Sequence, residues 1–195
     1  MNNDLKINNK QLFVFSKAVF LYIALVSVIS GCSVFGDDEF RYKPDALIVN
    51  DITGLNPILV GKIITPTKVS EISSAIVSTK GAISIGGGRY SQGGQIAYPD
   101  SLHFDMRDFD DVLDFDVNTK EITVQPGITW REIQEYIDPH NLSVMIMQTY
   151  ANFTVGGSLS VNVHGRYVSE GPLVKSVKQI KLILAGGNAI TASPT

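Results

Sequence analysis

Cysteine is almost absent from this 195-residue sequence, and its scarcity excludes two kinds of site. Cys32 is the single cysteine, so neither an intrachain disulfide nor a cysteine-based metal site is possible. The three histidines, His103, His140 and His164, do not stand at metal-ligand spacing, which argues against a structural zinc site. Basic side chains number 16 against 19 acidic ones and form no basic patch, so nucleic-acid binding has little support.

A hydrophobic run long enough for a comfortable transmembrane helix is also missing. Instead, lysines at 6, 10 and 17 precede the short apolar run 18–29, which leads into Ser30-Gly31-Cys32. This layout is typical of a secretory signal. Residues 29–32 (Ile-Ser-Gly-Cys) resemble the bacterial lipobox, in which the cysteine becomes the first residue and is lipidated. We therefore expect a lipoprotein signal peptide at 1–31 and a polar tether at 32–45; an uncleaved N-terminal anchor with an incidental cysteine is the alternative.

Either interpretation places the globular part outside the cytoplasm of a bacterium, tethered to a membrane face. Lipidation at Cys32 would make the membrane a partner of the protein. Ser33 follows the cysteine, where an aspartate would resemble the inner-membrane retention signal. The expected location is therefore the cell envelope, with the outer membrane (periplasmic face) or the cell surface favoured.

The most informative stretch is Ile83–Gly94, in which a short apolar strand runs into a glycine-rich loop. Clustered glycines permit positive φ angles and turn successive backbone N–H groups toward an anion. An arginine adds a planar cation, and a tyrosine and a serine add hydroxyl donors. The loop predicts a cradle for a phosphate or diphosphate, with a loop that binds nothing as the alternative. Its candidate residues are Gly86, Gly87, Gly88, Arg89, Tyr90, Ser91, Gly93 and Gly94.

The loop lacks the two most familiar nucleotide signatures. It has no GxGxxG spacing, and no Lys-Ser/Thr pair follows to make a nucleoside-triphosphate loop. The residues alone therefore indicate a phosphorylated ligand without identifying it.

The segments around the loop predict a βαβ unit. A strand is expected at 61–64, followed by a helix with Thr65 as N-cap and Pro66 in its first turn. Val69, Ile72 and Ile76 would form the buried stripe of that helix, which should end near Lys80-Gly81. A strand at 82–85 then delivers the loop to the carboxyl edge of the sheet, where ligands of α/β units usually bind.

Beyond the loop the pattern is mainly antiparallel. We expect a half-buried strand at 102–106 and a hairpin within 112–126. A capping box at Thr129–Glu132 should open a helix that buries Trp130, Ile133 and Ile137. A strand at 142–147 and a hairpin at 177–191 complete an α+β fold in two subdomains. The acidic residues of 105–116 are interpreted as a solvated face rather than a metal site, and Met145 and Met147 as core residues.

A second glycine-bearing segment, 149–165, mixes small residues, hydroxyls and an amide, as expected of a surface that contacts a polar ligand. In order, these features resemble the FAD-binding domain of the p-cresol methylhydroxylase and vanillyl-alcohol oxidase type of flavoprotein. The matching stretches are the Pro66-x-x-x-x-Glu71-Ile72 helix, the glycine loop, PDSLHFDMR at 99–107, ITVQPGITWREI at 122–133, TVGGSLSVNVHG at 154–165 and LAGGN at 184–188. The resemblance covers residues 56–193 within an expected domain of 46–195.

The resemblance implies that Gly86 to Gly94 wraps the diphosphate of FAD. It also implies a second set of residues that lines the flavin cleft: Thr149, Thr154, Gly156, Gly157, Ser160, Asn162 and His164. Relatives that bind flavin covalently place a histidine in the glycine loop or use a cysteine, whereas this chain has Arg89 and Tyr90 there. We therefore expect non-covalent FAD, with a link through His164 or Tyr90 as the alternative; for His164, a structural role is an equal alternative to flavin contact.

Length is the other departure, because members of this family continue into the rest of the FAD domain and a substrate domain. The resemblance thus implies a C-terminally truncated domain, with unknown catalytic residues and substrate and with a possible partner chain that supplies the missing part. Three functions stay open. They are the FAD-binding portion of an envelope-anchored oxidoreductase, a non-catalytic flavin-binding fragment that needs a partner chain, and a structural envelope lipoprotein whose loop is empty.

Overall fold

The computed structural model describes residues 47–194. The predicted signal peptide, tether and lipidation site at Cys32 lie outside these residues. No helix in the range 47–194 is long and apolar enough to cross a membrane. The described residues belong to one compact unit of mixed helix and strand, which confirms the α+β class.

A three-stranded parallel sheet carries the glycine loop. Its strands are β3 (Lys62–Ile64), β4 (Ile83–Gly86) and β5 (Leu102–Asp105), in the order β3-β5-β4. The predicted strand–helix–strand connection is confirmed, but β5 lies between the two strands that it joins. The prediction of a half-buried β5 was wrong, since all four of its residues are buried. A central parallel strand is covered on both faces, so alternation along β5 separates two buried faces rather than core from solvent.

Helix α2 (Val69–Ser78) connects β3 to β4 and buries Ile72 and Ala75. The predicted start at Thr65 and Pro66 was wrong. The Glu71 carboxylate accepts hydrogen bonds from the backbone N–H groups of Thr67 and Lys68, at 2.8 and 3.2 Å. These bonds satisfy the amides ahead of the first turn, so the helix begins only at Val69. It also ends at Ser78, before the predicted end.

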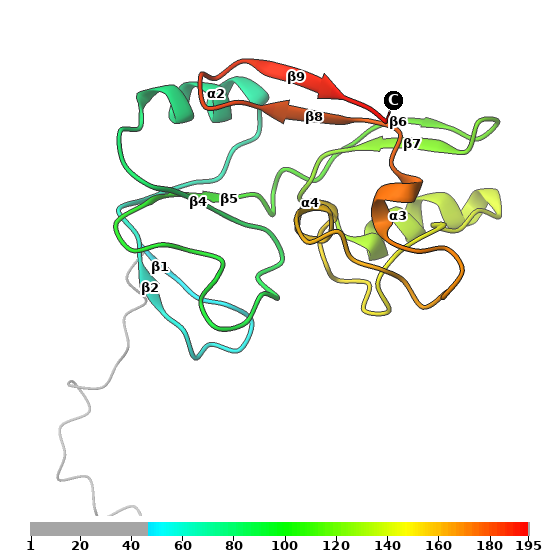
Figure 1. The fold of residues 1–195 in the computed structure, drawn as a ribbon, viewed down its shortest axis with the longest axis horizontal. Coiled ribbons are helices and arrows are strands. Elements are labelled where there is room, and N and C mark those ends of the chain that lie inside the picture. The colour runs from blue at the N-terminus through cyan, green and yellow to red at the C-terminus, as the bar shows by residue number, and fades with distance from the viewer. Residues whose placement is uncertain (1–46, 195) are drawn as a thin grey trace, which may run out of the picture. The chain divides into compact units, whose positions relative to one another are not determined.

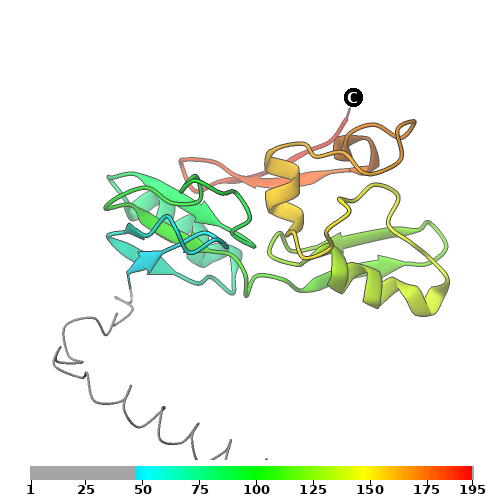
Figure 2. The same ribbon diagram turned by 90° about the horizontal axis from the view of Figure 1, so that it is seen from below.

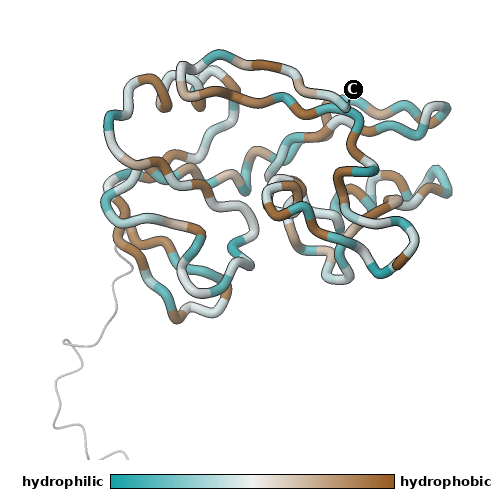
Figure 3. The backbone as a smooth tube through the Cα atoms, viewed as in Figure 1, coloured by the Kyte–Doolittle hydropathy of each residue, from teal (hydrophilic) through white to brown (hydrophobic). Residues whose placement is uncertain are grey.

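The buried apolar residues around the parallel sheet form two separate clusters. Leu102, Phe104 and Phe109 pack with α2 in one cluster. A second cluster, built on Val49, Val60 and Ile96, includes the short antiparallel pair β1 (Ile48–Val49) and β2 (Ile58–Leu59). Figures 1 and 2 show this pair beside the parallel sheet, and Figure 3 shows apolar segments running through the sheet region.

The predicted antiparallel hairpin is formed by β6 (Val112–Asp116) and β7 (Glu121–Val124). The capping box is also confirmed: Thr129 N–H donates to Glu132 Oε2 at 2.7 Å, and Glu132 N–H donates to Thr129 Oγ1 at 3.3 Å. The helix that it opens, α3 (Trp130–Ile137), is followed by the 3-10 turn η1 (Asp138–His140). The three predicted core residues of α3 are buried.

The strand predicted at 142–147 is absent from the described structure, where this segment is irregular. The amide of Gln134 replaces a neighbouring strand, because it donates to Leu142 O at 3.1 Å and accepts from Val144 N–H at 3.2 Å. Within this irregular segment, the side chain of Ile146 is buried in the core. Met145 is 56% exposed, so the prediction that it is a core residue was wrong.

Helix α4 (Val155–Ser160) and the 3-10 turn η2 (Leu173–Ser176) pack into the same core as α3. The predicted C-terminal hairpin consists of β8 (Ile180–Ile183) and β9 (Ala189–Ala192). Its turn lies on α2, where a side chain at Gly187 would meet Val77 and the Ser73 carbonyl. Figure 1 shows this hairpin alongside α2.

Candidate functional site

The glycine loop follows β4 at the carboxyl edge of the parallel sheet, as predicted. None of the backbone N–H groups from Gly87 to Gln92 donates a hydrogen bond to another group of residues 47–194. We call this run of donors the 87–92 arch. Peptide N–H groups are strong donors and require a partner. The arch is therefore a set of adjacent donors available to a ligand or to water.

The backbone donors at the end of the loop already have a partner, which is the carboxylate of Asp51. Asp51 Oδ2 accepts hydrogen bonds from the N–H groups of Gly93 and Gly94, at 3.0 and 3.3 Å. Both glycines have positive φ angles, 87° and 81°, a conformation that favours glycine. The backbone donors of Gly93 and Gly94, predicted to hold a phosphate, are thus occupied by the Asp51 carboxylate.

Asp51 is well suited to that position. The hydrogen bond from the Thr53 hydroxyl has the largest effect on the pKa of Asp51 and lowers it. Burial raises this pKa, but further hydrogen bonds from Asn56, Thr53 N–H and Gly94 N–H lower it, so that it is about 2. The carboxyl group is therefore ionised at neutral pH. Only 5% of the residue is exposed to solvent.

Arg89 turns away from the arch toward β5. Its Nη2 lies 2.8 Å from Asp105 Oδ2, and Arg107 binds the same carboxylate at 2.6 Å. Burial raises the pKa of Asp105, but the hydrogen bond from Arg107 and the charges of both arginines outweigh it, so the pKa is lowered overall. Asp105 was predicted to lie on a solvated face and is instead a buried ion-pair residue. Arg89, predicted as a phosphate-binding cation, shares its charge with that carboxylate.

A buried polar group under the loop was not predicted from the sequence. His103 on β5 is 0% exposed, and its Nδ1 lies 2.9 Å from Ser84 Oγ, which in turn lies 2.7 Å from Ser101 Oγ. A side chain at Gly86 would stand 2.9 Å from His103 Nε2, so only glycine fits there. Burial, and then the charge of Arg89, lower the pKa of His103. The sequence signal was the alternation of Ser101, His103 and Asp105.

Two polar atoms at this place have no partner. Among the described residues that are not exposed, Arg89 Nε and His103 Nε2 are the buried side-chain nitrogens without a hydrogen bond. Both side chains flank Gly86. Buried polar groups are normally satisfied, so these atoms indicate a water or ligand group under the loop.

The loop meets the second glycine segment at Thr154. This residue is 4% exposed, precedes α4 as its N-cap, and accepts a hydrogen bond from Gly157 N–H at 3.4 Å. A Cβ atom at Gly87 would overlap Thr154 Oγ1, and one at Gly88 would lie 3.2 Å from the Asn152 carbonyl. Glycine at 87 and 88 therefore lets the two predicted halves of the site touch.

An aromatic cluster adjoins this contact. Tyr90 packs edge to face against Tyr150 and Phe153, with ring centroids 5.3 and 4.9 Å apart. The Tyr90 hydroxyl donates to the Tyr150 hydroxyl at 3.4 Å, and this bond, followed by burial, raises the pKa of Tyr90. Tyr150 and Phe153 were not predicted as site residues, since nothing in their local sequence announces a partner sixty residues earlier.

Several predicted site residues of the second segment serve α4 itself. Gly156 N–H donates to the Pro126 carbonyl at 2.8 Å, and Ser160 Oγ donates to the Gly156 carbonyl at 2.8 Å. Asn162 adopts a left-handed φ of 46° after the helix and accepts from Val174 N–H at 3.1 Å. Gly157 and, in the loop, Ser91 are exposed.

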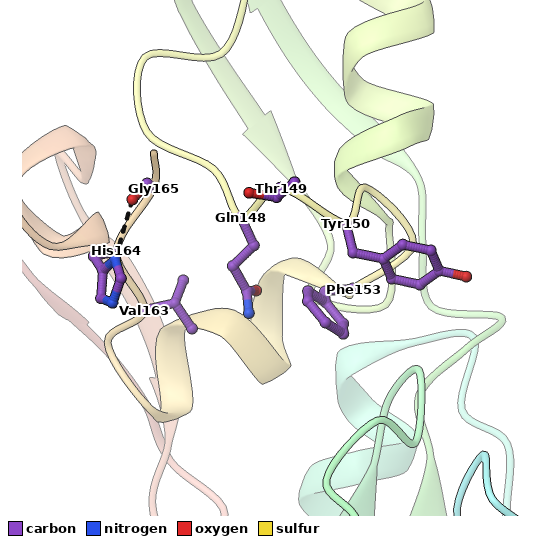
Figure 4. A pocket seen from close by; sticks show the side chains of 7 residues that line it. All are labelled: Gln148, Thr149, Tyr150, Phe153, Val163, His164 and Gly165. Carbon is purple, nitrogen blue, oxygen red and sulfur yellow. Dashed lines mark hydrogen bonds between the residues drawn. The ribbon is translucent and has the colours of Figure 1, made fainter. Parts of the chain in front are cut away.

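Thr149 and His164 line one hollow, of about 370 Å³. Figure 4 shows Gln148 between Phe153 and Tyr150 on one side and Val163 and His164 on the other. His164 is exposed, and its Nδ1 lies 3.0 Å from the Gly165 carbonyl. The lining residues are Gln148, Thr149, Tyr150, Phe153, Val163, His164 and Gly165. Within the described chain, no cluster of histidine and acidic residues is placed to hold a metal ion.

Residues 61–193 match the model of a protein family described as an FAD binding domain. The chain belongs to this family. Similar proteins include alditol oxidase from Streptomyces sp., 27% identical over 42% of this chain and 20% of its own length. L-Gulonolactone oxidase from Mus musculus is 26% identical over 66% of this chain and 30% of its length. Decaprenylphosphoryl-β-D-ribose oxidase from Mycolicibacterium smegmatis is 27% identical over 59% of this chain and 25% of its length.

Among solved structures, a variant of Phl p 4, a glucose dehydrogenase, shares the fold with a TM-score of 0.58 at 22% identity. The likeness covers 68% of this chain and 29% of that one. The chain thus spans under a third of the length of these curated relatives and of this solved structure. The FAD-binding family expected from the sequence is therefore confirmed, and the similar proteins include oxidases.

Proposed function

We propose that this chain is the FAD-binding portion of a flavin-dependent oxidoreductase that acts on an alcohol, a sugar-like compound or a similar small substrate. The observation that carries the proposal is the 87–92 arch, whose backbone N–H groups have no partner within residues 47–194. A diphosphate supplies the acceptors that such donors lack. FAD supplies the hydride-accepting chemistry when bound, and the protein supplies binding and orientation.

The residues at the loop fit this cofactor over part of the predicted stretch. We assign the diphosphate to the N–H groups from Gly87 to Gln92, because those of Gly93 and Gly94 are bonded to Asp51. The unpartnered Arg89 Nε and His103 Nε2 lie at the base of the same loop and are consistent with a polar guest there. The hollow with Thr149 and His164 is proposed as the flavin-facing part of a cleft between two subdomains.

The substrate class rests on the named relatives, which include an alditol oxidase and an L-gulonolactone oxidase. Since the chain spans at most 30% of those proteins, we propose that residues outside 47–194 contact the substrate, in a further segment or a partner chain. On its own, the chain would then be a flavin-binding fragment without turnover, which is the second candidate function.

We propose non-covalent attachment of FAD. Arg89 lacks a nucleophilic atom and pairs with Asp105, and the Tyr90 hydroxyl is bonded to Tyr150. His164 is exposed in the hollow and is the alternative point of attachment.

We further propose that the protein is tethered to the bacterial envelope by a lipid on Cys32, on the strength of the lipobox-like residues 29–32. Expression in a Gram-negative host with a clickable fatty acid tests this. Label is expected on the full chain and not on Cys32→Ser, whereas equal labelling would refute the anchor.

The decisive test of the function is titration of the purified full chain with FAD, followed by acid precipitation. We expect saturable quenching of flavin fluorescence during the titration. After acid precipitation, the yellow colour should stay in the supernatant. Colour that stays in the pellet would contradict non-covalent attachment. A folded sample that takes up no FAD would overturn the proposed function.

A further inference from the structure

The 87–92 arch is held at two points by one short segment, Asp51-Ile52. Ile52 N–H donates to the Arg89 carbonyl at 2.8 Å, in the middle of the arch. The Asp51 carboxylate binds the N–H groups of Gly93 and Gly94, where the arch ends. The donors of the arch are left free while the backbone on which they sit is fixed at both points.

Asp51 is itself held in place. Its Oδ1 accepts from Thr53 N–H at 2.9 Å and from the Thr53 hydroxyl, and its Oδ2 accepts from Asn56 Nδ2 at 2.8 Å. Oδ1 is thus held within its own turn, and Oδ2 is held both by Asn56 and by the glycine loop. A buried charge with several hydrogen bonds keeps one geometry, because loss of any bond leaves the charge poorly solvated.

We propose that Asp51 is a positioning residue for the diphosphate: it occupies the last two amides of the glycine loop and thereby fixes the preceding amides in a ligand-binding arrangement. This inference rests on the proposed function. A glycine-rich loop that must order itself on binding loses affinity, whereas one that is already ordered does not. The carboxylate of the chain also limits the diphosphate to Gly87–Gln92, since it leaves no free amide at 93 and 94.

Two variants test the proposal against a matched control. Asp51→Ala removes both acceptor oxygens and Asp51→Asn keeps one, while Asp114→Asn makes the same charge change at an exposed site on β6. With the full chain, we expect Asp51→Ala to raise the Kd for FAD by about tenfold to a hundredfold, Asp51→Asn to fall between, and the control to match the wild type.

Hydrogen exchange separates positioning from general damage. Without FAD, the amides of Gly93 and Gly94, followed in a peptide covering 86–95, should exchange faster in both Asp51 variants, while peptides covering β5 and α3 keep their protection. Equal loss of protection in all three regions would show a fold-wide defect and overturn the proposal. An unchanged Kd for FAD in Asp51→Ala would overturn it as well.

Failure of the proposed function gives a different result. A folded wild type that binds no FAD refutes that function and, with it, the role toward a diphosphate. Wild-type binding that is insensitive to Asp51 leaves the function intact and refutes only the inference. If Asp51→Ala does not fold, Asp51→Asn carries both measurements.

Discussion

The two glycine-bearing segments look alike in sequence and differ in how their backbone donors are used. In the loop after β4, the amides from Gly87 to Gln92 have no partner among the described residues. In the second segment, the backbone N–H groups of Gly156, Gly157 and Asn162 donate to Pro126 O, Thr154 Oγ1 and Leu159 O. Glycine allows close packing in both segments, but only the first segment keeps a run of backbone donors without a partner among the described residues. Composition alone does not distinguish the two uses.

The largest effect is expected from closing the contact between the segments. Gly87→Ala places a methyl group on Thr154 Oγ1, so either the loop or α4 must shift. Overpacking of this kind costs about 1–3 kcal/mol, and we expect the Kd for FAD to rise by about tenfold to a hundredfold. Fluorescence titration of the full chain measures it.

Gly81→Ala is the control, because nothing lies within 4 Å of a side chain at that position. Unchanged FAD binding in Gly87→Ala would mean that the loop does not bind the diphosphate against Thr154.

The second segment should respond in stability rather than in ligand affinity. In Gly156→Ala the added methyl group would lie 2.8 Å from Pro126 Cβ, and we expect the free energy of unfolding to fall by about 1–3 kcal/mol. Denaturant unfolding measures this loss. If the Kd for FAD changed as much as in Gly87→Ala, the contrast between the two segments would fail.

A smaller loss is expected from the hydrogen bond that ties α3 to α4. Trp130 Nε1 donates to Ser158 Oγ at 2.9 Å in the core, and Trp130→Phe removes that donor while keeping an aromatic ring. Because Ser158 still donates to Gln148 Oε1 at 2.7 Å, we expect a loss of about 1 kcal/mol. A thermal melt with no shift would show that the bond contributes nothing.

The smallest effect is expected from the acid titration of Asp51, which is ionised at neutral pH. Its folded pKa of about 2 lies below its ordinary value, so its contribution to stability is complete above pH about 4 and disappears as the pH falls toward 2. Melts from pH 7 to 2 should therefore show less acid sensitivity below pH 4 in Asp51→Asn than in the wild type. Parallel curves for the two proteins would contradict the lowered pKa.

Features whose partners are close in sequence were predicted well. The capping box Thr129–Glu132, the β6–β7 hairpin and the βαβ connection depend on neighbours a few residues apart or on simple periodicity. Two of the wrong predictions concern segments in which a side chain bonds to backbone groups and so changes where a helix or strand forms. Glu71 delays the start of α2, and Gln134 takes the backbone partners of 142–147. Neither effect has a pattern that periodicity detects.

The sequence by itself determined that a glycine-rich, donor-bearing loop follows a short apolar strand, and that the chain belongs with FAD-binding domains. Only the tertiary structure decided which of those donors are free. Asp51 reaches Gly93 across 42 residues, and β5 inserts between β3 and β4 to bring His103 under Gly86. A backbone donor is available only if nothing else in the folded chain accepts from it, and that depends on residues distant in sequence.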